Sequence, residues 1–282
     1  MNTACRWGPQ KEWSNMKLLD LFCGSGGAAY GYHLAGFTDI VGVDIHPMPR
    51  YPFQFIQEDA LSYLAEHGSE YDVIHASPPC QAYSIMRNLP WLKDRDYSTL
   101  ILPTLEMLEG LGKPYVLENV MGARYGAKGL TERGLAGHGL KAGWLCGQMF
   151  GLPFYRHRLF ATNWFWLASG HPKHRIHAIP SPHDGGGTMN HVRPKDPFHD
   201  KNGKSIIGPG NLAKGAGMPR QYVGSGTQTV GVGHAKGWRL APEAMGIDWM
   251  NRAELNQAVP PAYTEYLAGC LMKELGVRKA AT

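Results

Sequence analysis

The stretch from Leu18 to Leu34 constrains the fold of this chain more than any other part of the sequence. An apolar run over Leu18–Phe22 leads into a glycine-rich turn over Cys23–Gly27, and a helical pattern follows over Ala28–Leu34. A strand, a glycine turn and a helix in this order open the nucleotide-binding half of a doubly wound α/β sheet. The turn lacks the full G-x-G-x-x-G spacing of dinucleotide sites, so the pattern favours a ligand that contains a single adenosine.

Acidic residues stand at the ends of the next two predicted strands. The run Ile40–Asp44 ends in an acid about twenty residues after the glycine turn, where a partner for a ribose hydroxyl is expected. A third run ends near Gln57 and is followed by Asp59, which is suited to the amino group of an adenine. Both acids therefore fit the same adenosine ligand.

A cysteine, Cys80, stands behind two prolines at the end of another apolar run. The run is Tyr71–Ala76, and its length and boundaries predict a buried strand. The loop is stiff, because Pro78 and Pro79 fix their own backbone and favour an extended conformation in the residue before them. Open α/β sheets do their chemistry at the carboxyl ends of strands, so Cys80 is a candidate nucleophile. The alternative is a small buried cysteine in a turn, which is common for free cysteines.

A further apolar run, Pro114–Val120, delivers a carboxylate, Glu118, followed by an amide, Asn119, at its carboxyl end. Glu118 could simply cap the next helix. A nucleophile and an acid at the ends of neighbouring strands, above an adenosine site, would instead form a coherent active centre.

Together these segments resemble the cytosine-C5 methyltransferase family. The resemblance covers roughly residues 17 to 275, and its motifs stand in the family's order and spacing. Each motif alone is unspecific, but the set is highly specific. The motifs are Asp20–Gly27, Pro78–Gln81 with Ser84, Glu118–Val120, Arg156–Arg158 and Ala258–Ala262.

The resemblance implies a covalent reaction on cytosine. Addition of a thiolate to ring atom C6 makes C5 reactive enough to accept a methyl group, and Cys80 corresponds to that nucleophile. Glu118 would hold ring atom N3, Arg158 would bind the O2 oxygen, and Arg156 would support the catalytic loop. A base inside a duplex cannot reach such a centre, so the target base must be flipped out of the stack.

The methyl donor that the resemblance implies is S-adenosylmethionine. Phe22 would lie against its adenine, Asp44 on its ribose and Asp59 at the adenine amino group. The sequence departs from the family at Gln257, where an asparagine is usual, and at Ser77, where a glycine is common, but it keeps every expected catalytic group. The expected cofactor-binding residues are Asp20, Phe22, Gly24, Gly26, Asp44, Ile45, Asp59, Ala60, Pro78 and Gln257.

Positive charge is concentrated in one segment. Residues 153–240 contain twelve lysines and arginines against three acids, a net charge of +9, whereas the rest carries sixteen bases and twenty acids, or −4; the two sum to the chain's +5. An excess of this kind suits phosphates. The same segment turns rich in Gly, Pro, His and Lys, so it is expected to be irregular. By resemblance it is the target recognition region.

The predicted fold is α/β, a doubly wound, mostly parallel, Rossmann-like sheet of the S-adenosylmethionine-dependent methyltransferase type, with a small irregular recognition lobe. The expected domains are an extension over residues 1–15, a catalytic and cofactor-binding domain over 16–163, a basic recognition region over 164–237, and a segment over 238–282 that returns to the catalytic domain. Three aromatic residues at the entrance of the lobe, Trp164, Phe165 and Trp166, are expected to be hinge packing.

No apolar run is long enough for a membrane span and no signal peptide is evident, so a cytoplasmic protein is expected, in a bacterial host if a phage encodes it. Five cysteines do not suggest a disulfide framework. The three histidines His171, His174 and His177 lack the cysteine pair typical of structural zinc, so no metal is expected. We also expect a monomer.

The function predicted from the sequence is that of a DNA (cytosine-5-)-methyltransferase of the bacterial or phage type, with double-stranded DNA as its partner. Three alternatives stay open: an RNA (tRNA) cytosine-C5 methyltransferase, a C5 transferase that uses a modified S-adenosylmethionine, and a catalytically silent DNA-binding paralogue. His46 and Arg50, just after the ribose acid, are the only hint of a modified donor. The retained Cys80, Glu118 and Arg158 argue against a silent paralogue.

Overall fold

The structure is a computed structural model, and it describes residues 15–83, 97, 99–124, 140–152, 156–168, 170–171 and 241–280. The chain divides into two compact units. The first comprises residues 1–145, 157–168 and 257–282, and the second comprises residues 146–156 and 169–256. The domain boundaries expected from the sequence remain predictions.

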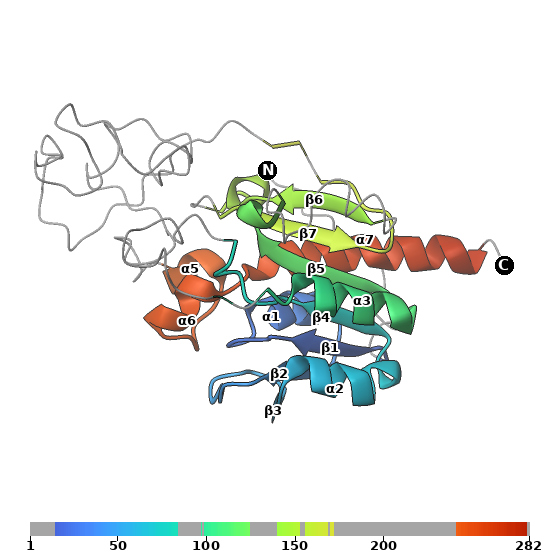
Figure 1. The fold of residues 1–282 in the computed structure, drawn as a ribbon. Coiled ribbons are helices and arrows are strands. Elements are labelled where there is room, and N and C mark those ends of the chain that lie inside the picture. The colour runs from blue at the N-terminus through green and yellow to red at the C-terminus, as the bar shows by residue number, and fades with distance from the viewer. Residues whose placement is uncertain are drawn as a thin grey trace, which may run out of the picture. The chain divides into compact units, whose positions relative to one another are not determined.

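The first unit contains a sheet of seven strands in the order β3-β2-β1-β4-β5-β7-β6 (Figure 1). β1 to β5 are parallel, whereas β7 pairs antiparallel with both β5 and β6. The strand order reverses between β1 and β4, where doubly wound sheets bind their ligands. The strands are β1 (Lys17–Leu21), β2 (Asp39–Asp44), β3 (Gln54–Gln57), β4 (Val73–Ala76), β5 (Tyr115–Val120), β6 (Lys141–Leu145) and β7 (Arg158–Thr162).

Helices cover both faces of this sheet (Figure 1). α2 (Ala60–His67) and α3 (Ile101–Leu111) lie on one face, and α1 (Gly27–Leu34) and α7 (Pro261–Ala280) lie on the other. Because side chains alternate along a strand, Leu19 and Leu21 of β1 join the apolar core with α2 and α3. Burial of each such leucine adds about 1.5–3 kcal/mol to the free energy of unfolding, relative to an exposed leucine. The opposite face also contains two fully buried polar residues, Asp20 and His75.

α1 and α7 approach each other closely at a glycine. A Cβ atom on Gly31 would lie 2.0 Å from Oγ1 of Thr264 and 2.1 Å from the carbonyl oxygen of Pro261. The Thr264 hydroxyl donates a hydrogen bond of 2.8 Å to the carbonyl of Ala28. This contact fixes α7 on the side of the sheet that carries the glycine turn.

The second unit contains η5 (Gly147–Phe150), α5 (Ala241–Met245) and α6 (Arg252–Gln257), whose last residue belongs to the first unit. Arg156 is 2 % exposed and donates to two carbonyls near the end of α6, that of Leu255 at 3.2 Å and that of Asn256 at 2.5 Å. Two short one-turn segments in the first unit, η2 (Gly68–Glu70) and η4 (Met121–Arg124), complete the described helical structure.

The doubly wound, mostly parallel sheet predicted from the sequence is confirmed. Of the predicted hinge aromatics, Trp164 and Trp166 are buried, with Trp166 over Gly143, while Phe165 is exposed. The rest of the predicted recognition region, apart from residues 165–168, 170 and 171, lies outside the described residues, as do His174 and His177.

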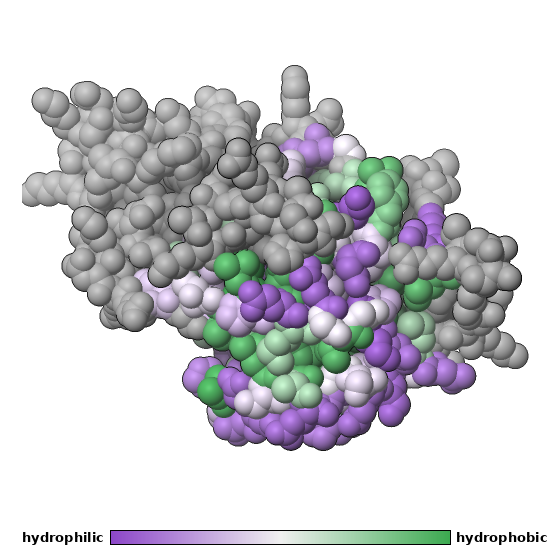
Figure 2. Space-filling model, turned by 45° about the vertical axis from the view of Figure 1, so that its right-hand side comes forward, coloured by the Kyte–Doolittle hydropathy of each residue, from purple (hydrophilic) through white to green (hydrophobic). Residues whose placement is uncertain are grey.

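Hydrophobic residues gather in the middle of the described surface drawn in Figure 2, and hydrophilic residues border them. Within the described ranges, no helix combines the length and the apolar character that crossing a membrane requires. The exposed large hydrophobic residues of the described part are Leu34, Ile45, Leu102, Phe165 and Leu167.

Candidate active site

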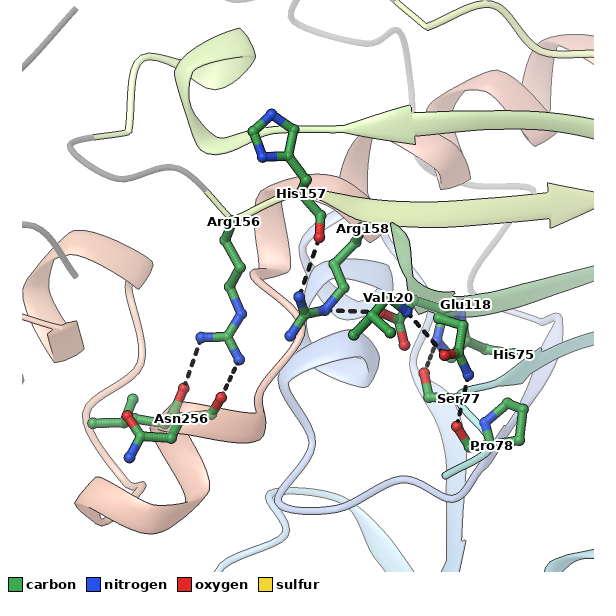
Figure 3. Close-up of polar contacts among 11 residues, drawn as sticks. His75, Ser77, Pro78, Glu118, Val120, Arg156, His157, Arg158 and Asn256 are labelled. Atoms are coloured by element: carbon green, nitrogen blue, oxygen red, sulfur yellow. Dashed lines mark hydrogen bonds and ion pairs between the residues drawn. The ribbon is translucent and has the colours of Figure 1, made fainter. Parts of the chain in front are cut away.

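The loop that carries Cys80 is tied to both neighbouring strands. It leaves β4 at Ser77, whose N–H donates to the carbonyl of Leu21 in β1 at 3.1 Å. On the other side, the amide of Asn119 in β5 donates to the carbonyl of Pro78 at 2.9 Å (Figure 3). Cys80 itself is half-buried, and its carbonyl accepts from the N–H of Tyr83 at 3.0 Å. The thiol therefore stands at the carboxyl edge of the sheet, as the sequence predicted.

Glu118 and Arg158 form an ion pair at the same edge. β7 runs antiparallel to β5, and Arg158 at its start is paired in register with Val120. This register brings Nε of Arg158 to 3.0 Å from Oε1 of Glu118 (Figure 3). The two side chains are only 10 % and 7 % exposed, so water screens the attraction little. Glu118 lies inside β5. The alternative prediction, that it caps a helix, is therefore wrong.

Arg156, two residues earlier, has its described hydrogen bonds with the carbonyls of Leu255 and Asn256. These bonds hold the backbone just before Gln257. The catalytic loop that Arg156 is expected to support continues into residues 84–96, which lie outside the described residues. That role therefore stays a prediction.

The other described cysteines are poor candidates for a nucleophile. None of the four cysteines in the described part of the chain is in a disulfide. Burial raises the pKa of the Cys23, Cys146 and Cys270 thiols, which keeps them protonated at neutral pH. Since the thiolate is the reactive form, Cys80 on its strand-end loop stays the candidate nucleophile among the described cysteines.

The turn after β1 has an unusual backbone. Phe22 has a φ of 55°, which is rare for a residue other than glycine. Residues with such a backbone conformation cluster at active sites and ligand sites. Gly24 and Gly26 also have positive φ, of 49° and 87°. The N–H of Gly24 donates to Oδ2 of Asp44 at 3.1 Å, so the turn is attached to the end of β2.

Asp44 and Asp59 lie where the sequence predicts them, at and beyond the carboxyl ends of β2 and β3. Asp44 also accepts from the N–H of His46 at 3.0 Å, and the next residue, Ile45, is 60 % exposed. Asp59 caps α2: its Oδ1 accepts from the N–H groups of Leu61 at 3.1 Å and Ser62 at 2.9 Å. Oδ2 of Asp59 takes no part in these bonds.

Three other expected cofactor residues differ in burial. Ala60, the first residue of α2, is 2 % exposed and forms part of the apolar core. Pro78 is buried, and Gln257 is exposed at the end of α6. The residues that follow Gln257 are held near the glycine turn, since the carbonyl oxygen of Val259 would lie 2.5 Å from a Cβ atom on Gly27.

Asp20 is a buried carboxyl group in β1, just before the glycine turn. Its side chain is fully buried in β1, and its Oδ2 accepts from the hydroxyl of Tyr51 at 3.2 Å. Burial raises the pKa of Asp20 well above its ordinary value, the Tyr51 bond opposes this, and Asp44 adds to it. The backbone N–H of Ala29 at the start of α1 also lies close enough to lower the pKa of this carboxyl. A cation bound here would favour the ionised form of both acids, so the residues fit S-adenosylmethionine, which is cationic at sulfur and at its amino group.

Three further residues at this edge were not predicted from the sequence. Tyr51, between β2 and β3, fills the space above Gly42, where a Cβ atom would lie 2.2 Å from its ring. His75 in β4 and Tyr32 in α1 form buried hydrogen bonds beneath the Cys80 loop. A glycine inside an apolar strand and a histidine inside another were the signals that could have found them.

Comparison with known proteins agrees with this geometry. A model of the C-5 cytosine-specific DNA methylase family matches residues 16–162, more than half of the chain. The chain therefore belongs to the C-5 cytosine-specific DNA methylase family. The family resemblance stated from the sequence is confirmed.

Curated relatives match parts of the chain. Type II methyltransferase M.AquIA of Picosynechococcus sp. is 32 % identical over 131 residues, covering 40 % of this chain and 52 % of that protein. Type II methyltransferase M.DdeI of Desulfomicrobium norvegicum is 29 % identical over 119 residues, covering 38 % of this chain and 28 % of that protein. The matched part of the chain thus spans about half or less of the length of these relatives.

Solved structures share the fold over nearly the whole chain. The crystal structure of the Dnmt2 methyltransferase of S. pombe has a TM-score of 0.55 at 15 % identity and covers 92 % of this chain and 99 % of its own. A protein described as a DNA modification methyltransferase encoded within a prophage (E. coli) has a TM-score of 0.54 at 17 % identity and covers 93 % of this chain and 100 % of its own. At these identities the likeness shows the fold alone.

Proposed function

We propose that this protein is a DNA (cytosine-5-)-methyltransferase that moves a methyl group from S-adenosylmethionine to C5 of a flipped-out cytosine in double-stranded DNA. The observation that carries the proposal is the buried Glu118–Arg158 ion pair beside the loop of Cys80. A buried carboxylate with a buried guanidinium, next to a thiol on a stiff loop, matches the three groups that C5 chemistry needs.

Cys80 and Glu118 have different roles in the proposed reaction. The thiolate of Cys80 adds to C6, and the electron pair released into the ring makes C5 nucleophilic while Glu118 stabilises charge at N3. After C5 has taken the methyl group, loss of the C5 proton expels the Cys80 thiolate from C6 and restores the ring. When bound, S-adenosylmethionine supplies a methyl group made electrophilic by its positive sulfur.

Arg158 has a second role in this arrangement. Its Nε pairs with Glu118, and its Nη1 donates to the carbonyl of His157 at 3.1 Å. Nη2 remains as the nitrogen that can reach the O2 oxygen of a cytosine. Arg158 would therefore orient Glu118 and bind the base together, which supports the roles expected from the sequence.

For the cofactor, Asp20 and Asp44 would attract the cationic donor, while Phe22, Gly24 and Gly26 shape the turn that approaches it. Phe22 would lie against the adenine and Asp59 at its amino group, and the exposed Ile45, with Ala60, Pro78 and Gln257, completes the expected cofactor-binding set. These assignments, a monomeric state and a bacterial cytoplasmic location remain part of the proposal.

RNA is the second candidate substrate. A relative named ribosomal RNA large subunit methyltransferase K/L, from Pseudoalteromonas atlantica, is 29 % identical over 84 residues, covering 30 % of this chain and 12 % of that protein. Parallel methylation assays on duplex DNA and on transfer and ribosomal RNA, each followed by base analysis, decide between the two.

The covalent step has a direct test. A DNA duplex with 5-fluorocytosine at the methylated site cannot lose fluorine as it would lose the C5 proton, so Cys80 should stay bonded to C6. We expect an adduct that survives denaturing electrophoresis and that peptide mapping assigns to Cys80, not to Cys23 or Cys146. Cys80→Ser should give none, since a hydroxyl ionises far less than a thiol. An active enzyme that gives no adduct, or one at another cysteine, contradicts the mechanism.

A further inference from the structure

A buried chain of hydrogen bonds lies beneath the Cys80 loop and takes no part in the chemistry proposed above. The hydroxyl of Tyr32 in α1 lies 3.1 Å from Nδ1 of His75 in β4. Nε2 of the same ring lies 2.9 Å from Oγ of Ser77, the first residue of the loop (Figure 3). Tyr32 and His75 are both fully buried, so water does not compete for the bond between them, while Ser77 is half-buried.

The direction of these bonds follows from burial. His75 is neutral, since burial lowers its pKa to about 3, so its ring has one donor and one acceptor. If Nδ1 donated to Tyr32, the buried Tyr32 hydroxyl would need another acceptor, at the cost of an unmade hydrogen bond if none exists. The satisfied arrangement has the Tyr32 hydroxyl donating to Nδ1 and the Nε2–H donating to Oγ of Ser77.

Ser77 attaches the Cys80 loop to the residues beneath it. The next two residues, Pro78 and Pro79, have no N–H group, so the loop cannot make the usual backbone hydrogen bonds there. The described ties of this part of the loop are the N–H of Ser77 to β1, the carbonyl of Pro78 to Asn119, and Oγ of Ser77 to His75. With two fixed proline φ angles between them, the orientation of Ser77 is transmitted to Cys80.

We propose that His75, oriented by Tyr32, is a positioning residue that holds Ser77 and so sets where the Cys80 thiol stands relative to C6 of the base. This inference rests on the proposed role of Cys80 as nucleophile. It also gives a reason for a serine at a position where the family commonly has a glycine, because a glycine has no side chain for His75 to hold.

The test uses three variants of the full chain and one matched control. Ser77→Ala removes the hydroxyl that His75 holds, Tyr32→Phe removes the hydroxyl that orients His75 but keeps the ring, and the third variant combines both. Thr104→Val is the control: it removes the hydroxyl of an α3 residue as buried as Tyr32, bonded at 2.6 Å to the carbonyl of Leu100.

Misplacing a reacting group by about 1 Å can lower a rate by about a hundredfold. We therefore expect Ser77→Ala to lower kcat by about tenfold to a hundredfold, with an unchanged KM for S-adenosylmethionine. Tyr32→Phe should lower kcat in the same sense. Because Tyr32 acts through Ser77, the double variant should lose no more than Ser77→Ala alone. Thr104→Val should lower Tm but keep kcat.

Amide hydrogen exchange of the peptide Ser77–Tyr83 tests the tether without any nucleic acid. Exchange should be faster in Ser77→Ala and Tyr32→Phe and unchanged in Thr104→Val. Wild-type exchange in both variants, a wild-type kcat for Ser77→Ala, or losses that multiply in the double variant would overturn the inference. If the wild-type protein methylates neither DNA nor RNA, the proposed function fails instead, and the exchange experiment still decides whether His75 holds the loop.

Discussion

At the scale of single residues, the site depends on charges that the fold has taken out of water. Glu118 and Arg158 are buried as a pair, and each would be costly to bury alone. Asp20 and His75 are buried without an ionic partner within hydrogen-bond distance in the described part of the chain, and burial moves the pKa of each towards its neutral form.

Glu118→Gln should impair chemistry and leave cofactor binding intact, since the carboxyl group acts on the flipped base. Loss of one such stabilising group lowers the rate by about a hundredfold to a thousandfold. Single-turnover methyl transfer measures the rate, and calorimetry with S-adenosylmethionine measures the affinity. Glu106→Gln, an exposed site on α3, is the control and should keep wild-type turnover. Turnover near the wild-type rate in Glu118→Gln would remove Glu118 from the mechanism.

His75 should make the protein less stable in acid. Its pKa is about 3 when folded and about 6.5 when unfolded, so between these values the unfolded chain binds the extra proton. The free energy of unfolding should therefore fall as pH falls through this window, by about 2 kcal/mol from this group at pH 5. Asp20 has a raised pKa when folded, so its contribution to the free energy of unfolding should rise as pH falls.

Urea unfolding from pH 7 to pH 5 separates the two groups. His75→Asn should unfold more easily than the wild type at pH 7 but should lose less stability on acidification, because the Asp20 contribution is common to both proteins. His33→Asn, at an exposed position, serves as the control. Parallel curves for wild type and His75→Asn would show that His75 is not neutral in the native protein.

At the scale of elements, the apolar runs of the sequence predicted where strands form, but they did not predict every pairing between strands. Four predicted runs each form a strand over most of their length, because short apolar stretches between turn residues favour that structure. They are Leu18–Phe22, Ile40–Asp44, Tyr71–Ala76 and Pro114–Val120. The antiparallel pairing of β7 with β5 was not predictable, since it depends on a contact between residues about forty positions apart. That pairing is what brings Arg158 to Glu118.

The contact between α1 and α7 can be tested through its glycine. Gly31→Ala places a Cβ atom against Thr264 and Pro261, and overpacking of this kind typically costs about 1–3 kcal/mol. Gly276→Ala, on the exposed side of α7, meets no atom within 4 Å and should raise stability by about 1 kcal/mol through helix propensity. Thermal unfolding of both variants checks the pair, and equal Tm values would mean that the helices do not pack this closely.

At the scale of the whole molecule, the proposed function needs an acidic cofactor edge and a basic DNA-binding segment, which the sequence places in different parts of the chain. If residues 173–236 bind DNA, neutralising Lys201 and Lys204 to glutamine should weaken DNA binding and flatten its salt dependence, by up to about 0.9 in slope per lost phosphate contact. Affinity for S-adenosylmethionine should not change. Binding titrations at several salt concentrations provide both the slope and the affinity.

The matched control neutralises Lys17 and Lys141, which lie at the edge of the sheet opposite Cys80. This double variant should keep the wild-type salt slope, because its charges are remote from the site. The same slope for both double variants would mean that Lys201 and Lys204 do not face DNA.

The sequence by itself determined the order of the elements and the chemical groups at their ends, because both are local properties of apolar runs, glycines and prolines. It thereby gave Cys80, Glu118 and the acids of the cofactor edge. Only the tertiary structure decided which groups meet. Arg158 reaches Glu118 through the register of β7, and Tyr51 reaches Asp20 across a glycine. Tyr32 of α1 reaches His75 of β4, because burial leaves the two side chains no water to bond with. Such contacts join distant positions, and no local pattern records them.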